Sequence, residues 1–280
     1  MTTLEFIKMH GLGNDFVIID HRDKALTLSP ETVRAICDRN LGVGCDQFII
    51  LEQSIDPIAD VCMRIYNPDG TESGACGNAA RCVASQVMTE SAQSSAIIQT
   101  RAGLLDCEKL DDGLYSVDMG PARSDWRDLP LAQACDTDHI NVAAGPLSAG
   151  VGVNIGNPHV VFMVDNALAV DLNTFGPQIE HHSMFPERTN VEVVQVLSRD
   201  RIRMRVWERG AGITLACGSG ACAALVATAR RGLTERKADV VLDGGTLTIE
   251  WMLDNNVLMT GPVATSFYGH LDLSLYGHST

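Results

Sequence analysis

Two cysteines in closely similar surroundings are the residues best suited to chemistry in this chain. Cys76 lies in the segment ACGNAARC and Cys217 in ACGSGAC, so each follows an alanine and precedes a glycine and a small polar residue. About half of the 280-residue chain separates the two cysteines. A second matching pair, GND at 13–15 and GNP at 156–158, has almost the same separation. These nearly equal spacings predict two similar halves that supply one cysteine each.

Both segments lead into a run of helix-forming residues, which indicates that each cysteine stands at the start of a helix. There the free backbone N–H groups and the positive end of the helix dipole stabilise negative charge. A thiol in such a place can have its pKa lowered from about 8.5 to roughly 3.5–7.5, and the same N–H groups can hold a carboxylate. If both segments face one cleft, two sulfur atoms approach a small anion from opposite sides. One thiolate could then remove a proton while one thiol protonates the other face, which inverts a carbon centre.

A cysteine beside a glycine is more often a small buried apolar residue than a reactive group. Only the paired placement of Cys76 and Cys217 favours the chemical interpretation for these two. We keep the apolar interpretation for the seven others, Cys37, Cys45, Cys62, Cys82, Cys107, Cys135 and Cys222.

Short apolar runs separated by Gly- and Asp-containing turns predict strands along both halves, with few helices between them. In the first half we expect strands at 4–10, 16–20, 47–52, 62–72 and 95–120, and helices at 29–40 and 77–90. In the second half we expect strands at 150–164, 190–210 and 239–251, and a helix at 219–232. The polar segment 121–130 is typical of a linker, which puts the domain boundary near residue 120. The fold class is therefore mixed α/β, with strands dominating and one central helix in each half.

The composition is that of a globular protein, 45% hydrophobic and 20% charged. A net charge of −14 argues against binding to nucleic acid, which requires a basic surface. The N-terminal segment has no signal-peptide core, and nowhere do 18 apolar residues follow one another. We therefore expect a cytoplasmic protein without a membrane span, whose cysteines are reduced.

A set of longer motifs points to one family. In chain order they are MHGLGNDF, LGVGCDQ, NPDGTESGACGNAARC, GNPH, FPERTN, ERGAGITLACGSGACA and, at 259–262, MTGP. Together they closely resemble the diaminopimelate epimerase family. The resemblance implies two pseudo-symmetric domains, each a strand-rich barrel-like sheet around a central helix, with the active site in the cleft between them. The implied domains are 1–120 with a returning C-terminal segment 266–280, and 121–265.

The family resemblance also implies the reaction and the state of the protein. Its members interconvert LL- and meso-2,6-diaminopimelate, a precursor of lysine and peptidoglycan, without pyridoxal phosphate or a metal ion. The implied partners are the small-molecule substrate and a second copy of the chain in a homodimer. By resemblance, Cys76 is the proton donor and Cys217 the proton acceptor in the LL to meso direction.

The other site residues implied by the resemblance fall into three groups. His159 and Glu208 match positions that influence the thiol pKa values, and Phe267 matches an aromatic residue at the dimer contact. Arg209 suits a carboxylate and Glu208 an ammonium group at the far end of the substrate. The full set of matching substrate-binding positions is Asn14, Gln47, Asn67, Gly77, Asn78, Asn157, Asn190, Glu208, Arg209, Gly218 and Ser219.

Several positions depart from the family pattern or invite other interpretations. Ala79 replaces a frequent glycine, Asn40 a frequent histidine and Cys45 a bulky apolar residue; Cys45 is either a third reactive thiol or, as we expect, buried. His181 and His182 form a surface pair without further metal ligands. GLGNDF lacks the third glycine of a dinucleotide site, and CGSGAC is not a serine-hydrolase elbow.

Two other functions compete with this interpretation. A racemase or isomerase for proline-type or unsaturated acids would share the two-domain fold and one or both cysteines, but it would not need Asn67, Asn190, Glu208 and Arg209 together. A thiol redox or metal-binding protein would use Cys76 and Cys217 as a disulfide or as ligands. The joint presence of these four residues, which match positions at the far end of the substrate, favours diaminopimelate as the substrate.

Overall fold

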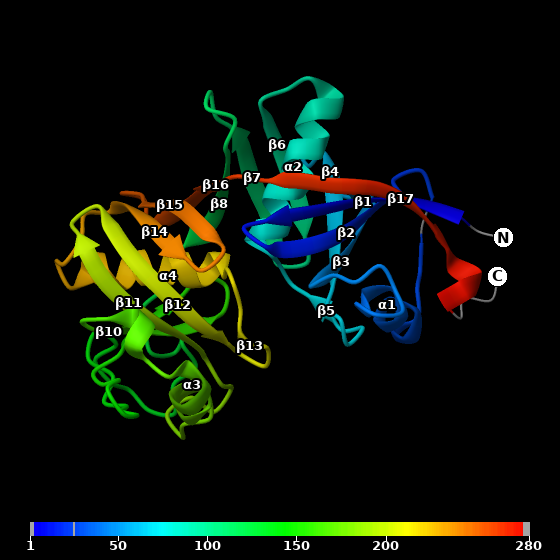
Figure 1. The fold of residues 1–280 in the computed structure, drawn as a ribbon. Helices are drawn as coiled ribbons and strands as arrows, with labels where there is room; N and C mark the ends of the chain where they lie inside the picture. Colours follow the sequence, from blue (N-terminus) through cyan, green and yellow to red (C-terminus); the bar gives the residue numbers. More distant parts are fainter. Residues whose placement is uncertain (1–2, 25, 277–280) are drawn as a thin grey trace. The chain divides into compact units, whose positions relative to one another are not determined.

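The computed structural model describes residues 3–24 and 26–276, and it divides into two compact units (Figure 1). The first unit comprises the chain up to Val117 together with the segment that begins at Gly261, and the second runs from Asp118 to Thr260. The expected boundary at residue 120 falls inside a strand, Tyr115–Pro121, that passes from one unit to the next. Of the expected returning segment, residues 277–280 lie outside the described residues.

The described part of the first unit is built mainly of strands, with two α-helices and a terminal 3-10 turn. Its elements are β1 (Thr3–Gly11), β2 (Asn14–Asp20), α1 (Pro30–Cys37), β3 (Gln47–Glu52), β4 (Val61–Tyr66), β5 (Glu72–Ser73), α2 (Gly77–Ser91), β6 (Ser95–Thr100), β7 (Gly103–Lys109), the start of β8 (Tyr115–Pro121), β17 (Ala264–Asp272) and η2 (Leu273–Tyr276).

The second unit repeats this order of elements. They are the end of β8, then β9 (Val151–Asn154), β10 (Pro158–Met163), η1 (Ala167–Ala169), α3 (Leu172–Glu180), β11 (Asn190–Ser198), β12 (Arg201–Glu208), β13 (Gly212–Ile213), α4 (Gly218–Arg230), β14 (Lys237–Leu242), β15 (Gly245–Trp251) and β16 (Asn256–Gly261).

Strand pairing is the same in both units, strand for strand. The first two strands pair antiparallel (β1–β2, β9–β10), the next pair is parallel (β2–β3, β10–β11), and the next is antiparallel (β3–β4, β11–β12). The fourth strand then pairs in parallel with the strand after the central helix (β4–β6, β12–β14), and an antiparallel meander follows in each unit. The prediction of a strand-dominated α/β fold with two similar halves is confirmed.

The register makes the two units comparable residue by residue. Phe16 of β2 lies opposite Gln47 of β3, and His159 of β10 lies opposite Asn190 of β11. Phe16 is separated from His159, and Gln47 from Asn190, by the same length of chain that separates GND from GNP. We call residues related in this way equivalent positions.

Helices α2 and α4 are buried over most of their circumference, because small residues let strands approach from several directions. Ten of the thirteen residues of α4, Gly218 and Gly220–Thr228, are buried. The helix α2 contacts β1, β4, β6 and β7, and α4 contacts β9, β10, β11, β12, β14 and β15. Each unit therefore has the central helix that the sequence predicts (Figure 1).

The strand β17 adds to the first unit after the repeat is complete. It pairs antiparallel with β1 from Thr3↔Asp272 to His10↔Ala264, and Figure 1 shows the red strand running along the blue one. The short helix α1 is capped by Ser29, whose side chain accepts a hydrogen bond from the N–H of Thr32 at 3.2 Å.

One sequence expectation for the second unit is wrong, and one helix of this unit was not predicted. The segment 121–130 is not a free linker, because Leu129 packs with Leu131 in the apolar core that includes Val160 of β10. Helix α3 was not expected, because it contains Gly176 and Pro177. Gly176 is required there since a Cβ atom would lie 2.6 Å from the Trp207 ring.

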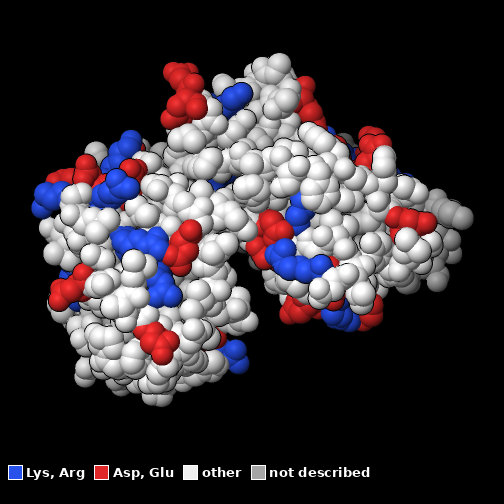
Figure 2. All heavy atoms as spheres, viewed as in Figure 1, with Lys and Arg blue, Asp and Glu red and all other residues white. Residues whose placement is uncertain are grey.

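Charged side chains of both signs are interspersed on the face shown in Figure 2. Many charged residues of the protein form ion pairs, such as Arg199–Glu235. Within the described residues, no helix is long and apolar enough to cross a membrane. In the same part of the chain, no three His, Cys, Asp or Glu side chains are grouped to hold a metal ion.

Candidate active site

Both candidate cysteines are N-cap residues, as the sequence predicts. Cys76 has extended backbone (φ −150°) immediately before α2, and Cys217 (φ −119°) immediately before α4. In each case the carbonyl oxygen accepts the first helical hydrogen bond, from Ala80 or from Ala221, at 2.9 Å. The first helical residues are the expected Gly77–Asn78 and Gly218–Ser219. Each sulfur therefore stands beside N–H groups that can receive an anion.

In the first unit, Asn14 connects the Cys76 segment to the sheet. The Asn14 Oδ1 atom accepts a hydrogen bond from Asn78 Nδ2 at 3.1 Å, and Cys76 Sγ lies 3.9 Å from the same oxygen. The Nδ2 atom of Asn14 donates a hydrogen bond to Asp46 Oδ2 at 3.0 Å. The buried Arg81 donates to Asn78 Oδ1 at 2.9 Å. These bonds fix the orientation of both amides next to the sulfur.

Sequence reasoning missed Asp46, which belongs to a charged cluster behind Asn14. Asp46 accepts from Arg39 at 2.6 Å, and Arg39 also binds Asp15, which pairs with the buried Lys8 at 2.6 Å. Although burial opposes ionisation, hydrogen bonds from Arg39 and Lys8 hold the pKa of Asp15 well below its ordinary value. Asp46 could have been found from its place next to Gln47 in the motif GCDQ.

Gln47 and Asn67 form a second polar pair in the first unit. Gln47 Nε2 donates to Asn67 Oδ1 at 3.1 Å, and Asn67 is in turn held by Thr71 through its backbone and side chain. Gln47 Oε1 is buried and has no hydrogen-bond partner in the described part of the protein. That oxygen is an acceptor available to a bound molecule.

Cys217 is in a different environment from the one that its helix position suggests. It is buried, with 6% of its surface exposed, and its sulfur lies 3.4 Å from the N–H of Gly220 and 3.6 Å from Ser219 Oγ. Burial and the nearby carboxylates Glu208 and Glu192 raise the Cys217 pKa well above its usual value. The expected lowering of the pKa is wrong for this cysteine, because loss of hydration outweighs the helix N-terminus. Cys217 is a thiol at neutral pH in this structure.

The raised pKa predicts slow alkylation of Cys217. Because only the thiolate reacts, iodoacetamide should modify Cys217 more slowly than free cysteine at pH 7.5, and the rate should still be rising with pH where that of free cysteine has levelled off. Peptide mapping by mass spectrometry at several pH values measures this. A Cys217 rate that levels off below the pH at which free cysteine does would contradict it.

Three of the four residues expected to hold the far end of the substrate, Asn190, Glu208 and Arg209, lie near the end of β12 in the second unit, whereas Asn67 belongs to the first unit. Asn190 Oδ1 accepts from the backbone N–H of Arg209 at 2.9 Å, and its Nδ2 donates to the carbonyl of Pro158 at 2.9 Å. Glu208 accepts a hydrogen bond from Thr214 Oγ1. Asn190 is buried, so contact with a substrate would require it to exchange one of these bonds.

Arg209 is exposed, and its guanidinium donates to the carbonyl oxygen of Glu187 at 3.2 Å. Among the described residues, no carboxylate oxygen lies within 4.0 Å of its nitrogen atoms. An arginine without an acidic partner suits a carboxylate ligand.

His159 is fully buried, and its ring binds two oxygen atoms rather than a sulfur. Its Nδ1 lies 2.7 Å from Glu192 Oε1, and its Nε2 lies 2.8 Å from Asn157 Oδ1. Sequence reasoning missed Glu192, although a lone carboxylate in the apolar run NVEVV was a usable signal. Its partner 33 residues away became visible only through the parallel pairing of β10 and β11.

Gly220 is the residue around which Cys217 and Glu192 converge. A Cβ atom there would lie 2.9 Å from Glu192 Oε1 and 3.2 Å from Cys217 Sγ. Ala79 stands at the corresponding place three residues after Cys76, so alanine is compatible with that turn of the fold.

We expect Gly220→Ala to reduce turnover and to lower the melting temperature. Alanine gains roughly 0.5–1 kcal/mol over glycine within a helix, but the new methyl group displaces the sulfur or the carboxylate. Turnover and thermal unfolding measure the effect, with Ala79→Gly as the matched control that should lose stability and keep more activity. A Gly220→Ala variant that is both more stable and fully active would contradict the expectation.

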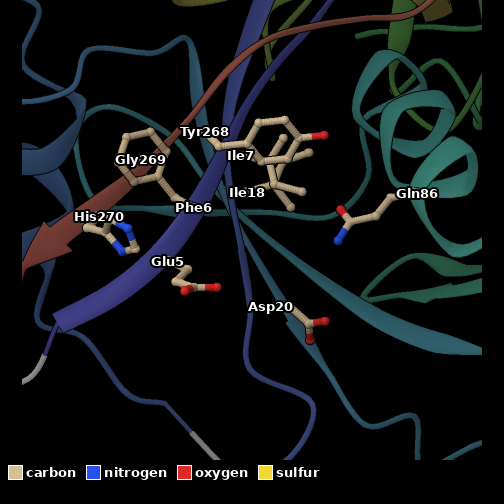
Figure 3. Close-up of a pocket in the computed structure, with 9 residues that line it drawn as sticks. All are labelled: Glu5, Phe6, Ile7, Ile18, Asp20, Gln86, Tyr268, Gly269 and His270. Carbon is tan, nitrogen blue, oxygen red and sulfur yellow. The ribbon is translucent and has the colours of Figure 1, made fainter. Parts of the chain in front are cut away.

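Phe267 lies on β17, where its ring packs edge-on against Phe6 with centroids 6.0 Å apart while 48% of the residue remains exposed. The neighbouring Tyr268 is 73% exposed. Tyr268 lines a pocket of about 430 Å³, and Figure 3 shows the residues around it. Its lining residues come from β1, β2, α2 and β17 and are Glu5, Phe6, Ile7, Ile18, Asp20, Gln86, Tyr268, Gly269 and His270. None of them belongs to the Cys76 or Cys217 groups, so this pocket is not the site that the motifs predict.

Solved structures with the same arrangement of elements define the class of fold. A PhzF-family phenazine biosynthesis protein from Bacillus anthracis matches with a TM-score of 0.68 at 15% identity, covering 97% of this chain and 99% of that one. A hydroxyproline epimerase from Agrobacterium vitis matches with a TM-score of 0.68 at 13% identity, covering 99% and 96%. The chain therefore has the fold shared by PhzF-family proteins and proline-type epimerases.

Sequence comparison identifies the family more specifically than the fold does. The diaminopimelate epimerase family model matches residues 6–124 and 151–266. The diaminopimelate epimerase of Rhodospirillum centenum is 60% identical over 270 residues, 96% of this chain and 93% of that relative. That of Acidiphilium cryptum is 50% identical, over 96% of this chain and 97% of the relative. The chain belongs to the diaminopimelate epimerase family, and it is an isomerase.

Proposed function

We propose that this protein interconverts LL- and meso-2,6-diaminopimelate, with Cys76 and Cys217 as the two acid/base groups. The observation that carries the proposal is that each unit places a cysteine as the N-cap of its central helix. Two thiols on opposite faces of one α-carbon give inversion, because one takes the proton and the other returns a proton.

The helix N-termini have a second role in the proposed reaction. The N–H groups around Gly77–Asn78 and Gly218–Ser219 would bind the carboxylate of the reacting centre and stabilise the charge that develops when the α-proton leaves. Asn14, Gln47 and Asn157 would complete the contacts to this end of the substrate. The chemistry uses only protons held on sulfur, so the mechanism assigns no role to pyridoxal phosphate or a metal ion.

The raised pKa of Cys217 limits how it can act as the acceptor in the LL to meso direction. The resting thiol has to lose its proton before it can remove one from the substrate. A substrate α-ammonium group near the sulfur would favour the thiolate, since an opposite charge lowers the pKa of an acid. Cys76 would carry the proton for the opposite face, and His159 and Glu208 would tune the two thiols through their surroundings.

The far end of the substrate distinguishes diaminopimelate from shorter amino acids. Arg209 would bind the distal carboxylate and Glu208 the distal ammonium group, with Asn67 and Asn190 ordering this end. A cytoplasmic homodimer with Phe267 at its contact, acting in lysine and peptidoglycan precursor synthesis, completes the proposal.

Chiral chromatography of the reaction products tests the proposed function. The purified, reduced protein should convert LL-diaminopimelate to a mixture with the meso form without any added cofactor, and a chelator should not inhibit it. Proline and hydroxyproline serve as comparison substrates. Turnover of these acids without turnover of diaminopimelate would replace the proposed substrate.

A further inference from the structure

Glu192, His159 and Asn157 form a chain of side chains in the second unit. Both side chains of the Glu192–His159 pair have no exposed surface, and the His159 ring stands between two oxygen atoms, Glu192 Oε1 at 2.7 Å and Asn157 Oδ1 at 2.8 Å. The Asn157 amide nitrogen has no hydrogen-bond partner within the described residues, although the residue is only half-buried. In this series of hydrogen-bonded side chains, the group left to bind another molecule is therefore the N–H₂ group of Asn157.

The fold itself does not require this polar pair. The position equivalent to His159 is Phe16, and the position equivalent to Glu192 is Ile49, both fully buried in the first unit. The equivalent strands of the first unit thus pack around an apolar pair. Burying a carboxylate is costly, so its presence in only one unit indicates a purpose other than packing.

Hydrogen-bond geometry determines where the protons lie. Because Asn157 presents an oxygen to His159, Nε2 has to carry a hydrogen. The hydrogen between Nδ1 and Glu192 can belong to either partner, so the pair is net neutral as imidazolium–carboxylate or as imidazole–carboxylic acid. Burial raises the pKa of Glu192, which favours sharing of that proton. Glu192 Oε2 is buried without a partner in the described residues, so the hydrogen bond through Oε1 to His159 orients this carboxyl group.

We propose that Glu192 is a positioning residue of the epimerisation: it holds His159 so that Nε2–H binds Asn157 Oδ1 and the Asn157 amide directs its N–H₂ group toward the substrate. This inference rests on the proposed function of the site. Through this chain, Asn157 becomes a hydrogen-bond donor to the substrate carboxylate.

In the first unit, the equivalent asparagine, Asn14, is held by the other end of its amide group. Asn14 gives its N–H₂ group to Asp46, and its oxygen is turned toward Asn78 and Cys76. The two asparagines thus differ in which end of the amide the protein retains. Similar halves can in this way offer a donor on one side and an acceptor on the other, which an asymmetric amino acid requires.

Two substitutions separate positioning from packing. In Glu192→Ile, which copies Ile49, the His159 ring loses its Nδ1 partner and can take the tautomer that lacks a hydrogen on Nε2, so Asn157 is released. We expect kcat/KM to fall about 100-fold, the size of effect that misplacing a substrate-binding group produces. In Glu192→Gln, the amide donates to Nδ1 and keeps the hydrogen on Nε2, so kcat/KM should stay within about tenfold of the unchanged protein.

Selective ¹⁵N-histidine NMR on the protein without substrate reads the tautomer directly, with His159→Phe used to assign the signal. A protonated Nε2 is expected in the unchanged protein and in Glu192→Gln. An unprotonated Nε2 in the unchanged protein would overturn the proposal, and so would a Glu192→Gln variant as inactive as Glu192→Ile. The double variant His159→Phe/Glu192→Ile, which copies the first unit, should fold and show that lost activity does not come from unfolding.

The proposal and the proposed function can fail separately. If the unchanged protein does not epimerise diaminopimelate, the function fails, while the NMR result still decides the state of His159. If the protein is active and the Glu192→Ile variant keeps full activity with a normal melting temperature, the function stands and the positioning role is wrong.

Discussion

Cys76→Ala should still exchange the α-hydrogen of LL-diaminopimelate with solvent while forming almost no meso product. Cys217 remains able to remove the proton and to return one to the same face, but the group that protonates the opposite face is missing. General acid–base groups contribute about 10²–10⁴-fold to rate, so net inversion should fall by roughly 10³-fold or more. NMR in heavy water measures exchange and inversion together.

Cys217→Ala should give the mirror-image result, with exchange of the meso substrate at its D-centre and none at the corresponding LL centre. Both variants should keep their far-UV circular dichroism and melting temperature to within a few degrees. Cys62→Ala and Cys135→Ala are matched controls, one in each unit, at partly exposed thiols outside the site. Near-normal inversion by Cys76→Ala or Cys217→Ala would contradict a mechanism that needs both sulfurs.

Arg209→Ala should weaken binding of diaminopimelate and reduce the preference for a substrate with a second carboxylate. Hydrogen bonds to charged groups contribute about 1.5–3 kcal/mol, which corresponds to roughly 10- to 150-fold in kcat/KM. The loss should appear mainly in KM, because the guanidinium acts far from the reacting carbon. Initial rates over a range of substrate concentrations separate KM from kcat.

Arg199→Ala is the matched control for that experiment, because Arg199 pairs with Glu235 on the surface of the same unit and is 65% exposed. Exposed pairs of this kind contribute about 0–1 kcal/mol, so its kinetics should hardly change. Arg209→Lys should recover part of the binding, since it keeps the charge and loses the planar geometry. An Arg209→Ala variant with unchanged preference for diaminopimelate over shorter amino acids would remove the arginine from its proposed role.

Local signals allowed much of the fold to be predicted from the sequence. The nearly equal spacing of the two cysteine segments and of the GND and GNP segments indicated two halves, and the strand pairing repeats accordingly. The helix-forming residues after Cys76 and Cys217 indicated one helix in each half, and strands contact both helices from several sides. Helix α3 escaped prediction because glycine and proline normally end helices, and here Trp207 packs over Gly176.

The electrostatics of the site depend on contacts that no local pattern reveals. The position of Cys217 before a helix predicted a lowered pKa, yet burial and two carboxylates raise it. Glu192 and His159 meet only because β10 and β11 pair in parallel. Likewise, the role of Asp46 depends on a hydrogen bond to a residue 32 positions away. Strand order and burial decide such contacts, and a sequence pattern specifies neither.

Deuterium labelling of the unchanged enzyme tests the two-cysteine mechanism most directly. The reduced protein is incubated briefly with LL-diaminopimelate in heavy water, and the α-carbons of substrate and product are examined separately by NMR. Two sulfurs that act on opposite faces should place deuterium at the inverted centre of the meso product, while the remaining LL substrate keeps its hydrogen at early times. Equal early labelling of substrate and product would show that one group serves both faces, and it would contradict the account.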